Sequence, residues 1–225
     1  MKVDDVVQQV LSLGRGTLFA KIDIESAFRN VPVHPHDRHL LGMQWDGQLY
    51  VDTVLPFGLR SSPKIFNCIA DALQWIAKQR GISYLDHYLD DFITAGAPEC
   101  EECSQNLSIL TDTCDILCLP MAIDKQEGPT TCIIFLGIEL DTEKLELRLP
   151  HHKLLRLKSL LQRWAHFRSV KKRDLESLVG QLHDASIVVR SGRNFIRRLI
   201  NALKSSHKHS SDSFIWLNIE ARSGI

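Results

Sequence analysis

The sequence of residues 88–94, YLDDFIT, places two adjacent carboxylates, Asp90 and Asp91, in an apolar stretch with the character of a strand. Successive side chains of a β-strand point to opposite faces of the sheet, so a tight turn is needed before both carboxylates can serve one site. We expect a hairpin with strands over 82–85 and 88–94. An isolated Asp-Asp pair is usually a solvated turn, so its meaning depends on the rest of the chain.

A third carboxylate, Asp23, lies at the end of an apolar strand expected over 18–24. Three close carboxylates repel one another, and divalent cations relieve that repulsion. Mg²⁺ prefers oxygen ligands, and two Mg²⁺ ions about 3.5–4 Å apart can activate an attacking hydroxyl and stabilise a leaving pyrophosphate. Asp23, Asp90 and Asp91 are therefore candidate ligands of two Mg²⁺ ions, for which Mn²⁺ can substitute.

The remaining pattern predicts an α+β part followed by an all-helical part, with a boundary near residue 148. Asp46-Gly47 between two apolar runs indicates a hairpin, and Ser61, Ser62 and Pro63 indicate the start of a helix. Further strands are expected over 40–45, 48–54, 133–140 and 145–149, and helices over 3–13, 61–80, 98–118, 151–166, 171–189 and 193–204. Residues 205–225 read as a linker toward a further domain.

The net charge of the 225 residues is zero, but the two parts of the chain carry opposite charges. Residues 1–147 hold 11 Lys+Arg and 22 Asp+Glu, a net charge of −11. Residues 148–209 hold 15 Lys+Arg and 3 Asp+Glu, a net charge of +12. An acidic part suits divalent cations and a basic part suits a phosphate backbone, although two solvated faces that attract each other would show the same split.

Composition excludes several classes of protein. No run of about 18 apolar residues is present, so we expect no membrane partner. Acidic residues close to Met1, with no apolar block behind them, argue against a secretory signal, so we expect an intracellular protein of cytoplasm or nucleus. Six cysteines in a chain of this length are typical of reduced thiols. Cys100, Cys103, Cys114 and Cys118 leave a zinc site open, although their helical surroundings disfavour it.

Four motifs in order resemble those of reverse transcriptases, which are RNA-directed DNA polymerases. Residues 88–91 resemble the Tyr-x-Asp-Asp signature, and residues 21–28, KIDIESAF, resemble the first catalytic motif. Residues 55–63, LPFGLRSSP, resemble the Leu-Pro-x-Gly block that precedes a helix, and residues 135–137, FLG, resemble the primer-grip hairpin. The sequence of residues 178–182, LVGQL, is most similar to that of DIRS-type or Ty3/gypsy-like retrotransposon polymerases.

The resemblance implies a right-hand polymerase: an antiparallel palm sheet with helices and partial fingers over 1–147, then a helical thumb or connection over 148–204. Only about 22 residues precede Asp23, so the fingers segment is expected to be mostly missing. The chain then resembles a piece of a longer polyprotein that includes a ribonuclease H domain. Asp23 and Asp90 take the role of principal metal ligands, and Asp91 that of the supporting carboxylate.

Other residues acquire roles from the resemblance alone. Lys125 matches a lysine that protonates the leaving pyrophosphate, although a solvated surface lysine is an equal alternative. The backbone carbonyl of Ile24 completes a metal shell, and the Phe28 ring excludes a ribose 2′-hydroxyl. The nucleotide pocket is bordered by Phe57 and Gly58. Further expected contacts are Arg60 with template or phosphate, and Leu136 and Gly137 with the primer.

Basic residues of the helical part are expected to hold the template and primer through phosphate contacts that are independent of sequence. They are Arg156, Lys158, Arg163, Lys171, Lys172 and Arg173. The expected function is primer extension with deoxynucleoside triphosphates on an RNA or DNA template. Two alternatives stay open: a non-catalytic nucleic-acid-binding remnant of a retrotransposon polyprotein, and a different two-metal phosphotransferase such as a nuclease.

Overall fold

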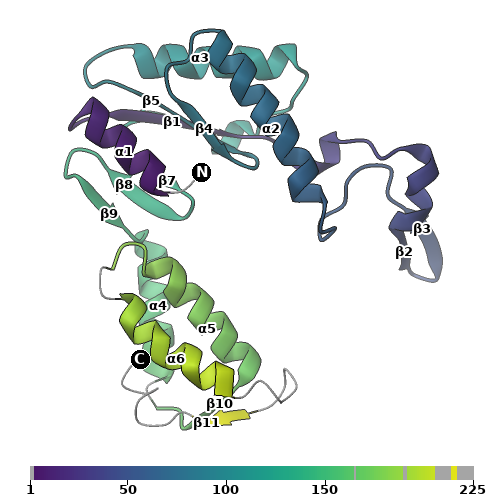
Figure 1. The fold of residues 1–225 in the computed structure, drawn as a ribbon, viewed down its shortest axis with the longest axis vertical. Coiled ribbons are helices and arrows are strands. Elements are labelled where there is room, and N and C mark those ends of the chain that lie inside the picture. The colour runs from purple at the N-terminus through teal and green to yellow at the C-terminus, as the bar shows by residue number, and fades with distance from the viewer. Residues whose placement is uncertain (1–2, 165, 190–191, 206–213, 217–225) are drawn as a thin grey trace. The chain divides into compact units, whose positions relative to one another are not determined.

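The computed structural model describes residues 3–164, 166–189, 192–205 and 214–216 (Figure 1). Its contacts divide the chain into two compact units. The sheet unit comprises Met1–Leu136 and Leu140–Glu146. The helical unit comprises Gly137–Glu139 and Leu147–Ile225.

A four-stranded antiparallel sheet forms the centre of the sheet unit, with the strand order β4-β5-β1-β6. The strands are β1 (Leu18–Asp23), β4 (Leu85–Tyr88), β5 (Asp91–Gly96) and β6 (Glu127–Thr130). The register of β1 and β5 runs from Leu18 opposite Gly96 to Asp23 opposite Asp91. Carboxylates from two strands are thus brought to the same end of the sheet.

Two helices, α2 (Ser62–Gln79) and α3 (Glu102–Ile116), pack on this sheet, and a shorter helix, α1 (Val3–Leu13), precedes β1 (Figure 1). Apolar side chains at helical spacing on α2, among them Phe66, Ala70 and Leu73, are fully buried. They join a core that also contains Ile22, Ile24, Leu85, Phe92, Cys103, Leu110 and Cys114. This core supports both strands that carry the carboxylates.

Shorter elements make up much of the rest of residues 27–148. The 3₁₀ helices are η1 (Ala27–Asn30), η2 (Pro35–Leu41) and η3 (Ile123–Lys125). The hairpin of β2 (Gly42–Trp45) and β3 (Gln48–Val51) turns at Asp46-Gly47, and its side chains are exposed. A three-stranded sheet follows, in the order β7 (Cys132–Phe135), β8 (Ile138–Asp141) and β9 (Glu146–Arg148).

The helical unit contains three amphipathic helices and a two-stranded ribbon. The helices are α4 (His151–Trp164), α5 (Lys172–Ala185) and α6 (Gly192–Ser205). The ribbon pairs β10 (Ser169–Lys171) with β11 (Phe214–Trp216). Its core is formed by Trp164, Val170, Leu175, Leu178, Leu199 and Ile215. Several basic side chains of the unit, among them Arg156, Lys158, Arg163 and Arg173, are exposed.

The predicted α+β fold with a helical part after it is confirmed, two strand predictions were wrong, and two strands were not expected. The turn of the catalytic hairpin lies at Leu89-Asp90, whereas strands over 82–85 and 88–94 would place it at 86–87. The strand expected over 133–140 is two strands. Strand β6 was not expected, because Gly128 and Pro129 disfavour strands. Within the expected linker 205–225, Phe214–Trp216 forms a strand.

Candidate active site

A two-residue turn brings Asp90 and Asp91 to one site. Tyr88 and Asp91 are direct partners in the β4–β5 hairpin, which leaves Leu89 and Asp90 as the loop. Leu89 has a φ of 55°, a left-handed conformation that leucine rarely adopts. The backbone N–H of Ile24 donates to the carbonyl oxygen of Asp90 at 3.0 Å. This bond attaches the turn to the end of β1.

The carboxylate of Asp23 lies directly across from that of Asp91, because the two residues are cross-strand partners. Residues in this relation have Cβ atoms about 4.5–5.5 Å apart. The N–H of Ala122 donates to the carbonyl oxygen of Asp23 at 2.9 Å, and the N–H of Glu25 donates to that of Pro120 at 2.8 Å. The backbone around Asp23 is therefore held on both sides, and its side chain is only 13% exposed.

The proximity of the three carboxylates changes their protonation. Burial, together with the charges of Asp90 and Asp23, raises the pKa of Asp91 from 3.8 to about 6. Burial also raises the pKa of Asp90, and the charge of Asp23 acts in the same direction. A cation near these groups would favour their ionised forms, so the site is electrostatically suited to bind one.

Two lysines already neutralise part of this charge. The ammonium of Lys125 donates to Oδ1 of Asp23 at 3.0 Å, and this hydrogen bond raises the pKa of Lys125. Lys21 is two residues before Asp23 in β1, and its Nζ lies 2.7 Å from Oε2 of Glu127. The charge of Lys21 lowers the pKa of Asp91, opposing the effect of burial.

Two cavities adjoin the carboxylates. One has a volume of about 410 Å³ and is lined by Lys21, Asp23, Asp91, Lys125 and Glu127, among others. The other has a volume of about 740 Å³ and is lined by Asp23, Glu25, Ser26 and residues 121–125. Both reach Asp23 and Lys125, so a charged ligand in either cavity would meet a carboxylate and an ammonium.

Donor chemistry and proximity make Asp23, Asp90 and Asp91 a fitting set of ligands for hard divalent cations, which take carboxylate oxygens. Within the described residues, no three side chains of His, Cys, Asp or Glu are gathered closely enough to hold a metal ion as they stand. Oδ1 of Asp23 accepts a hydrogen bond from Lys125. A cation at Oδ1 of Asp23 would compete with Lys125 for that oxygen.

Three aromatic rings, those of Phe28, Phe57 and Phe66, pack together as an aromatic wall. The ring of Phe28, in η1, lies 5.3 Å from that of Phe57 and 6.0 Å from that of Phe66. Phe66 is buried in the core, Phe28 is half-buried, and Phe57 is 73% exposed. Phe28 thus packs against the core residue Phe66 and against Phe57. That support suits a rigid steric surface better than a freely moving side chain.

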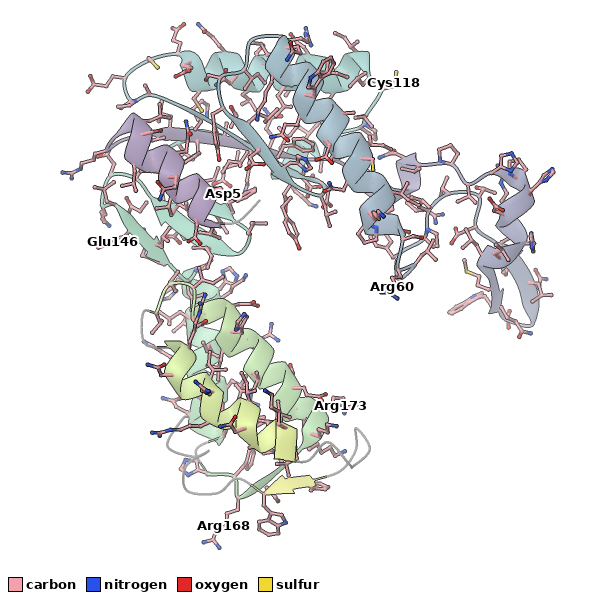
Figure 2. The ribbon with its side chains drawn as sticks, in the orientation of Figure 1. Asp5, Arg60, Cys118, Glu146, Arg168 and Arg173 are labelled. Carbon is pink, nitrogen blue, oxygen red and sulfur yellow. The ribbon has the colours of Figure 1, made fainter. Side chains whose placement is uncertain are left out.

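The remaining predicted pocket residues differ in accessibility. Ile24 is buried, so only its backbone can face a ligand. Gly58 has a φ of 85°, and a Cβ added there would meet no atom within 4 Å, so its backbone is open to close approach. Arg60 is exposed in the loop that leads into α2 (Figure 2). Neither Gly58 nor Arg60 is brought into contact with the carboxylates by any bond in the described structure.

The predicted primer-grip residues form a turn of their own. Leu136 and Gly137 connect β7 to β8, with φ values of 48° and 75°. The ammonium of Lys153 donates to the carbonyl oxygen of Gly137 at 3.3 Å. The half-buried turn thus lies beside a basic side chain.

The predicted nucleic-acid-binding residues belong to the helical unit. Arg156, Lys158 and Arg163 are exposed on α4, opposite its apolar face. Lys171 and Lys172 are half-buried, and Arg173 extends outward from the start of α5, with Asp174 3.9 Å away (Figure 2). Exposed guanidinium and ammonium groups in this number are suited to phosphate contacts.

Sequence reasoning missed Lys21, Arg29 and Asp52. Lys21 and Asp23 share one face of β1 because they are two residues apart, which is a signal that could have been used. Arg29 and Asp52 form an ion pair of 2.6 Å across 23 residues, for which the sequence offers no local signal. The four cysteines considered for zinc divide into two buried and two exposed side chains, with no metal-binding group among the described residues.

The family model described as "Reverse transcriptase (RNA-dependent DNA polymerase)" matches residues 2–140, more than half of the chain. The chain belongs to the reverse transcriptase family. The match includes the motifs around Asp23, Asp90 and Asp91, and it confirms the resemblance inferred from them.

Curated relatives of this reverse transcriptase chain are polyproteins. The Pro-Pol polyprotein of Feline foamy virus is 29% identical over 133 residues, which are 59% of this chain and 11% of the relative. The Transposon Tf2-3 polyprotein of Schizosaccharomyces pombe is 27% identical over 97 residues, 43% of this chain and 7% of the relative. The chain thus spans about a tenth of the length of the relatives it matches. The finer class, DIRS-type or Ty3/gypsy-like, stays a prediction.

Solved structures share the fold. A foamy viral protease-reverse transcriptase in complex with double-stranded DNA matches 97% of this chain and 36% of its own, with a TM-score of 0.67 and 19% identity. A foamy viral protease-reverse transcriptase in complex with an RNA/DNA hybrid matches 94% of this chain and 26% of its own, with a TM-score of 0.67 and 20% identity. Among the described residues, no helix is both long and apolar enough to cross a membrane.

Proposed function

We propose that this chain is the palm and thumb of an RNA-directed DNA polymerase, which extends a primer with deoxynucleoside triphosphates. The observation that carries the proposal is the pairing of Asp23 with Asp91 at the end of β1 and β5. The bond from the backbone N–H of Ile24 to the backbone carbonyl of Asp90 supports the inclusion of Asp90 in the same site. Membership of the reverse transcriptase family supports the choice of polymerase chemistry over that of a nuclease.

Asp23 and Asp90 would be the principal ligands of two Mg²⁺ ions, supported by Asp91 and by the backbone carbonyl of Ile24. When bound, two such ions lower the pKa of an attacking hydroxyl and stabilise charge on a leaving pyrophosphate. Lys125 keeps an ammonium 3.0 Å from Asp23, with its pKa raised by that bond. Once a cation binds Asp23, Lys125 would be released to donate a proton to the leaving pyrophosphate.

The aromatic wall would select the sugar of the incoming nucleotide. Phe28 is held between the core residue Phe66 and the exposed Phe57, so its ring cannot retreat easily from a ligand. A ring fixed under the sugar leaves no space for a 2′-hydroxyl, which favours deoxynucleotides. Gly58 allows close backbone approach beside Phe57, and Arg60 is free to reach a template phosphate from its exposed loop.

The helical unit would serve as the thumb, and the turn at Leu136-Gly137 as the primer grip. Charge supports the first assignment, since residues 148–209 carry a net charge of +12. The relatives with the same fold were solved with double-stranded DNA and with an RNA/DNA hybrid, so a template with its primer is the proposed ligand here. In the full polyprotein, a ribonuclease H domain would follow.

One observation favours a second candidate, a non-catalytic nucleic-acid-binding remnant. Lys125 is hydrogen-bonded to Asp23, and the carboxylates of the described structure are not arranged closely enough to hold a metal ion as they stand.

Measurements on one sample can separate the two candidates and a nuclease. Primer extension and nuclease cleavage would be measured with Mg²⁺ on a labelled DNA primer annealed to RNA, beside binding of the same duplex. Extension lost in Asp90→Asn but kept in Asp112→Asn, an exposed carboxylate on α3, is the expected result. Binding without extension would favour the remnant, and cleavage would favour a nuclease.

A further inference from the structure

The segment that carries Phe57 is attached to the segment that carries Phe28 by a short antiparallel ladder. The N–H of Leu55 donates to the carbonyl oxygen of Val31 at 3.0 Å, and the N–H of Val33 donates to that of Thr53 at 2.9 Å. Pro32 and Val54 are paired between these two bonds. The positions of the two rings therefore depend on the register of this ladder.

An ion pair also joins the two segments of the ladder. Nη1 of Arg29, the residue after Phe28, donates to Oδ1 of Asp52 at 2.6 Å. The Asp52 side chain is only 9% exposed, and the N–H of Asp52 also donates to the carbonyl oxygen of Leu41 at 3.1 Å. A buried carboxylate is costly without its partner, so the pair is maintained, and the planar guanidinium fixes its direction.

The other end of the segment is also fixed. The Ser62 hydroxyl, fully buried at the start of α2, donates to the carbonyl oxygen of Pro56 at 2.9 Å. Residues 52–56 are thus held by Arg29 at one end and by Ser62 at the other. Phe57 follows directly, and its ring lies 5.3 Å from that of Phe28.

We infer that the Arg29–Asp52 ion pair is a positioning device for sugar selection: it sets the distance between the rings of Phe28 and Phe57, and hence the space left beside the nucleotide's 2′ carbon. The inference rests on the proposed function, and it assigns Arg29 and Asp52 no contact with substrate. Loss of the charge of Asp52 would release the guanidinium, loosen the ladder and let both rings move outward. Ribonucleotides would then be admitted.

The test is single-nucleotide incorporation on a primed RNA template, with a deoxynucleoside triphosphate and with the matching ribonucleoside triphosphate. The ratio of the two kcat/KM values is expected to fall about tenfold in Asp52→Asn, below the roughly 10²-fold cost of a 1 Å misplacement. The kcat with the deoxynucleotide should change less than the ratio. Glu143→Gln, which removes an exposed ion pair with Arg15, is the matched control and should leave the ratio unchanged.

A double-variant cycle separates this role from a general loss of structure. In a Phe28→Val background, which removes the steric surface itself, Asp52→Asn should cause no further fall in the ratio, because both changes act through one ring. Additive effects would overturn the inference. If Asp52→Asn does not fold, Arg29→Lys provides the same comparison, since it keeps the charge but loses the planar fork.

The outcomes are distinguishable. A wild-type protein that selects deoxynucleotides, with an unchanged ratio in Asp52→Asn and Arg29→Lys, would overturn the inference and leave the proposed function intact. A wild-type protein that binds the primed template but incorporates neither nucleotide would overturn the proposed function, and this inference with it.

Discussion

Asp23 and Asp91 face each other as cross-strand partners at the end of two central strands, although 67 residues separate them in the chain. Because the sheet is built on a buried core that includes Ile22 and Phe92, the separation of their backbones is set by the fold. Like charges held in this way raise the free energy of the protein, and a bound cation would remove that cost.

The stability of the metal-free protein should fall as Asp91 ionises. Its pKa is raised from 3.8 to about 6 in the folded protein, so the carboxyl stabilises the fold fully below about pH 4, and this contribution is lost as the pH rises through 6. Asp90 acts in the same direction. Urea unfolding midpoints would be measured with a metal chelator present at about pH 4 and about pH 7. The difference between the two midpoints should be smaller in Asp91→Asn than in the wild type. The difference between the two midpoints that the wild type shows should persist in Asp112→Asn. The same change of midpoint with pH in Asp91→Asn and in the wild type would contradict the assignment.

Lys125→Met should bind divalent cations more tightly and react more slowly. The ammonium of Lys125 competes with a cation for Asp23, and one unit charge at about 4 Å is worth roughly 1 kcal/mol in water, or about fivefold in affinity. Mn²⁺ titration followed by electron paramagnetic resonance measures the affinity, and single-turnover incorporation measures the rate. Lys144→Met, an exposed lysine beside Asp141, is the control. Weaker Mn²⁺ binding in Lys125→Met would show that Lys125 does not oppose the metal.

Binding to a primed template should depend on salt through the basic face of α4. Arg156 and Arg163 are seven residues apart and exposed. Each phosphate contact that is removed should reduce the slope of log K against log salt by about 0.9 for duplex DNA. Fluorescence anisotropy with Arg156→Gln and Arg163→Gln would measure the slopes, with the neighbouring Gln162→Ala as an uncharged control. Unchanged slopes would place the nucleic acid elsewhere.

Alanine substitutions at two glycines should change the stability of the protein in opposite directions. A Cβ at Gly96, where β5 meets α3, would collide with the backbone nitrogen of Cys103, so Gly96→Ala should destabilise the protein by about 1–3 kcal/mol. Gly180 lies exposed within α5, and a Cβ there meets no atom within 4 Å. Gly180→Ala should therefore stabilise its unit by about 0.5–1 kcal/mol through helix propensity. Thermal unfolding of both variants checks the two signs, and a stabilising Gly96→Ala would contradict the packing.

Features determined by local chemistry were predictable from the sequence. Pro63 after Ser61 and Ser62 correctly indicated the start of α2, and Asp46-Gly47 correctly indicated the β2–β3 turn. At that helix start, however, the Ser62 hydroxyl bonds to Pro56 and does not cap the helix. The motif resemblance identified the family, because four short patterns occurred together in one order.

Features determined by distant contacts were not predictable. The turn at Leu89-Asp90 contains no glycine or asparagine, the residues that most often adopt positive φ in such turns. Leu89 nevertheless has a positive φ, beside Asp90, whose carbonyl bonds to Ile24. Lys125 meets Asp23 across 102 residues. Register and long-range pairing depend on the complete core, so no window of sequence contains them.

Templated incorporation of a single nucleotide tests the central claim most directly. A DNA primer on an RNA template would be offered each of the four deoxynucleoside triphosphates separately, with Mg²⁺, and the product would be resolved by length. The proposed function predicts addition of the complementary nucleotide only, by the wild type and Asp112→Asn, and no addition by Asp23→Asn or Asp90→Asn. No incorporation by a wild-type protein that still binds the primed template, or incorporation unaffected by Asp90→Asn, would contradict the claim that these carboxylates form a polymerase site.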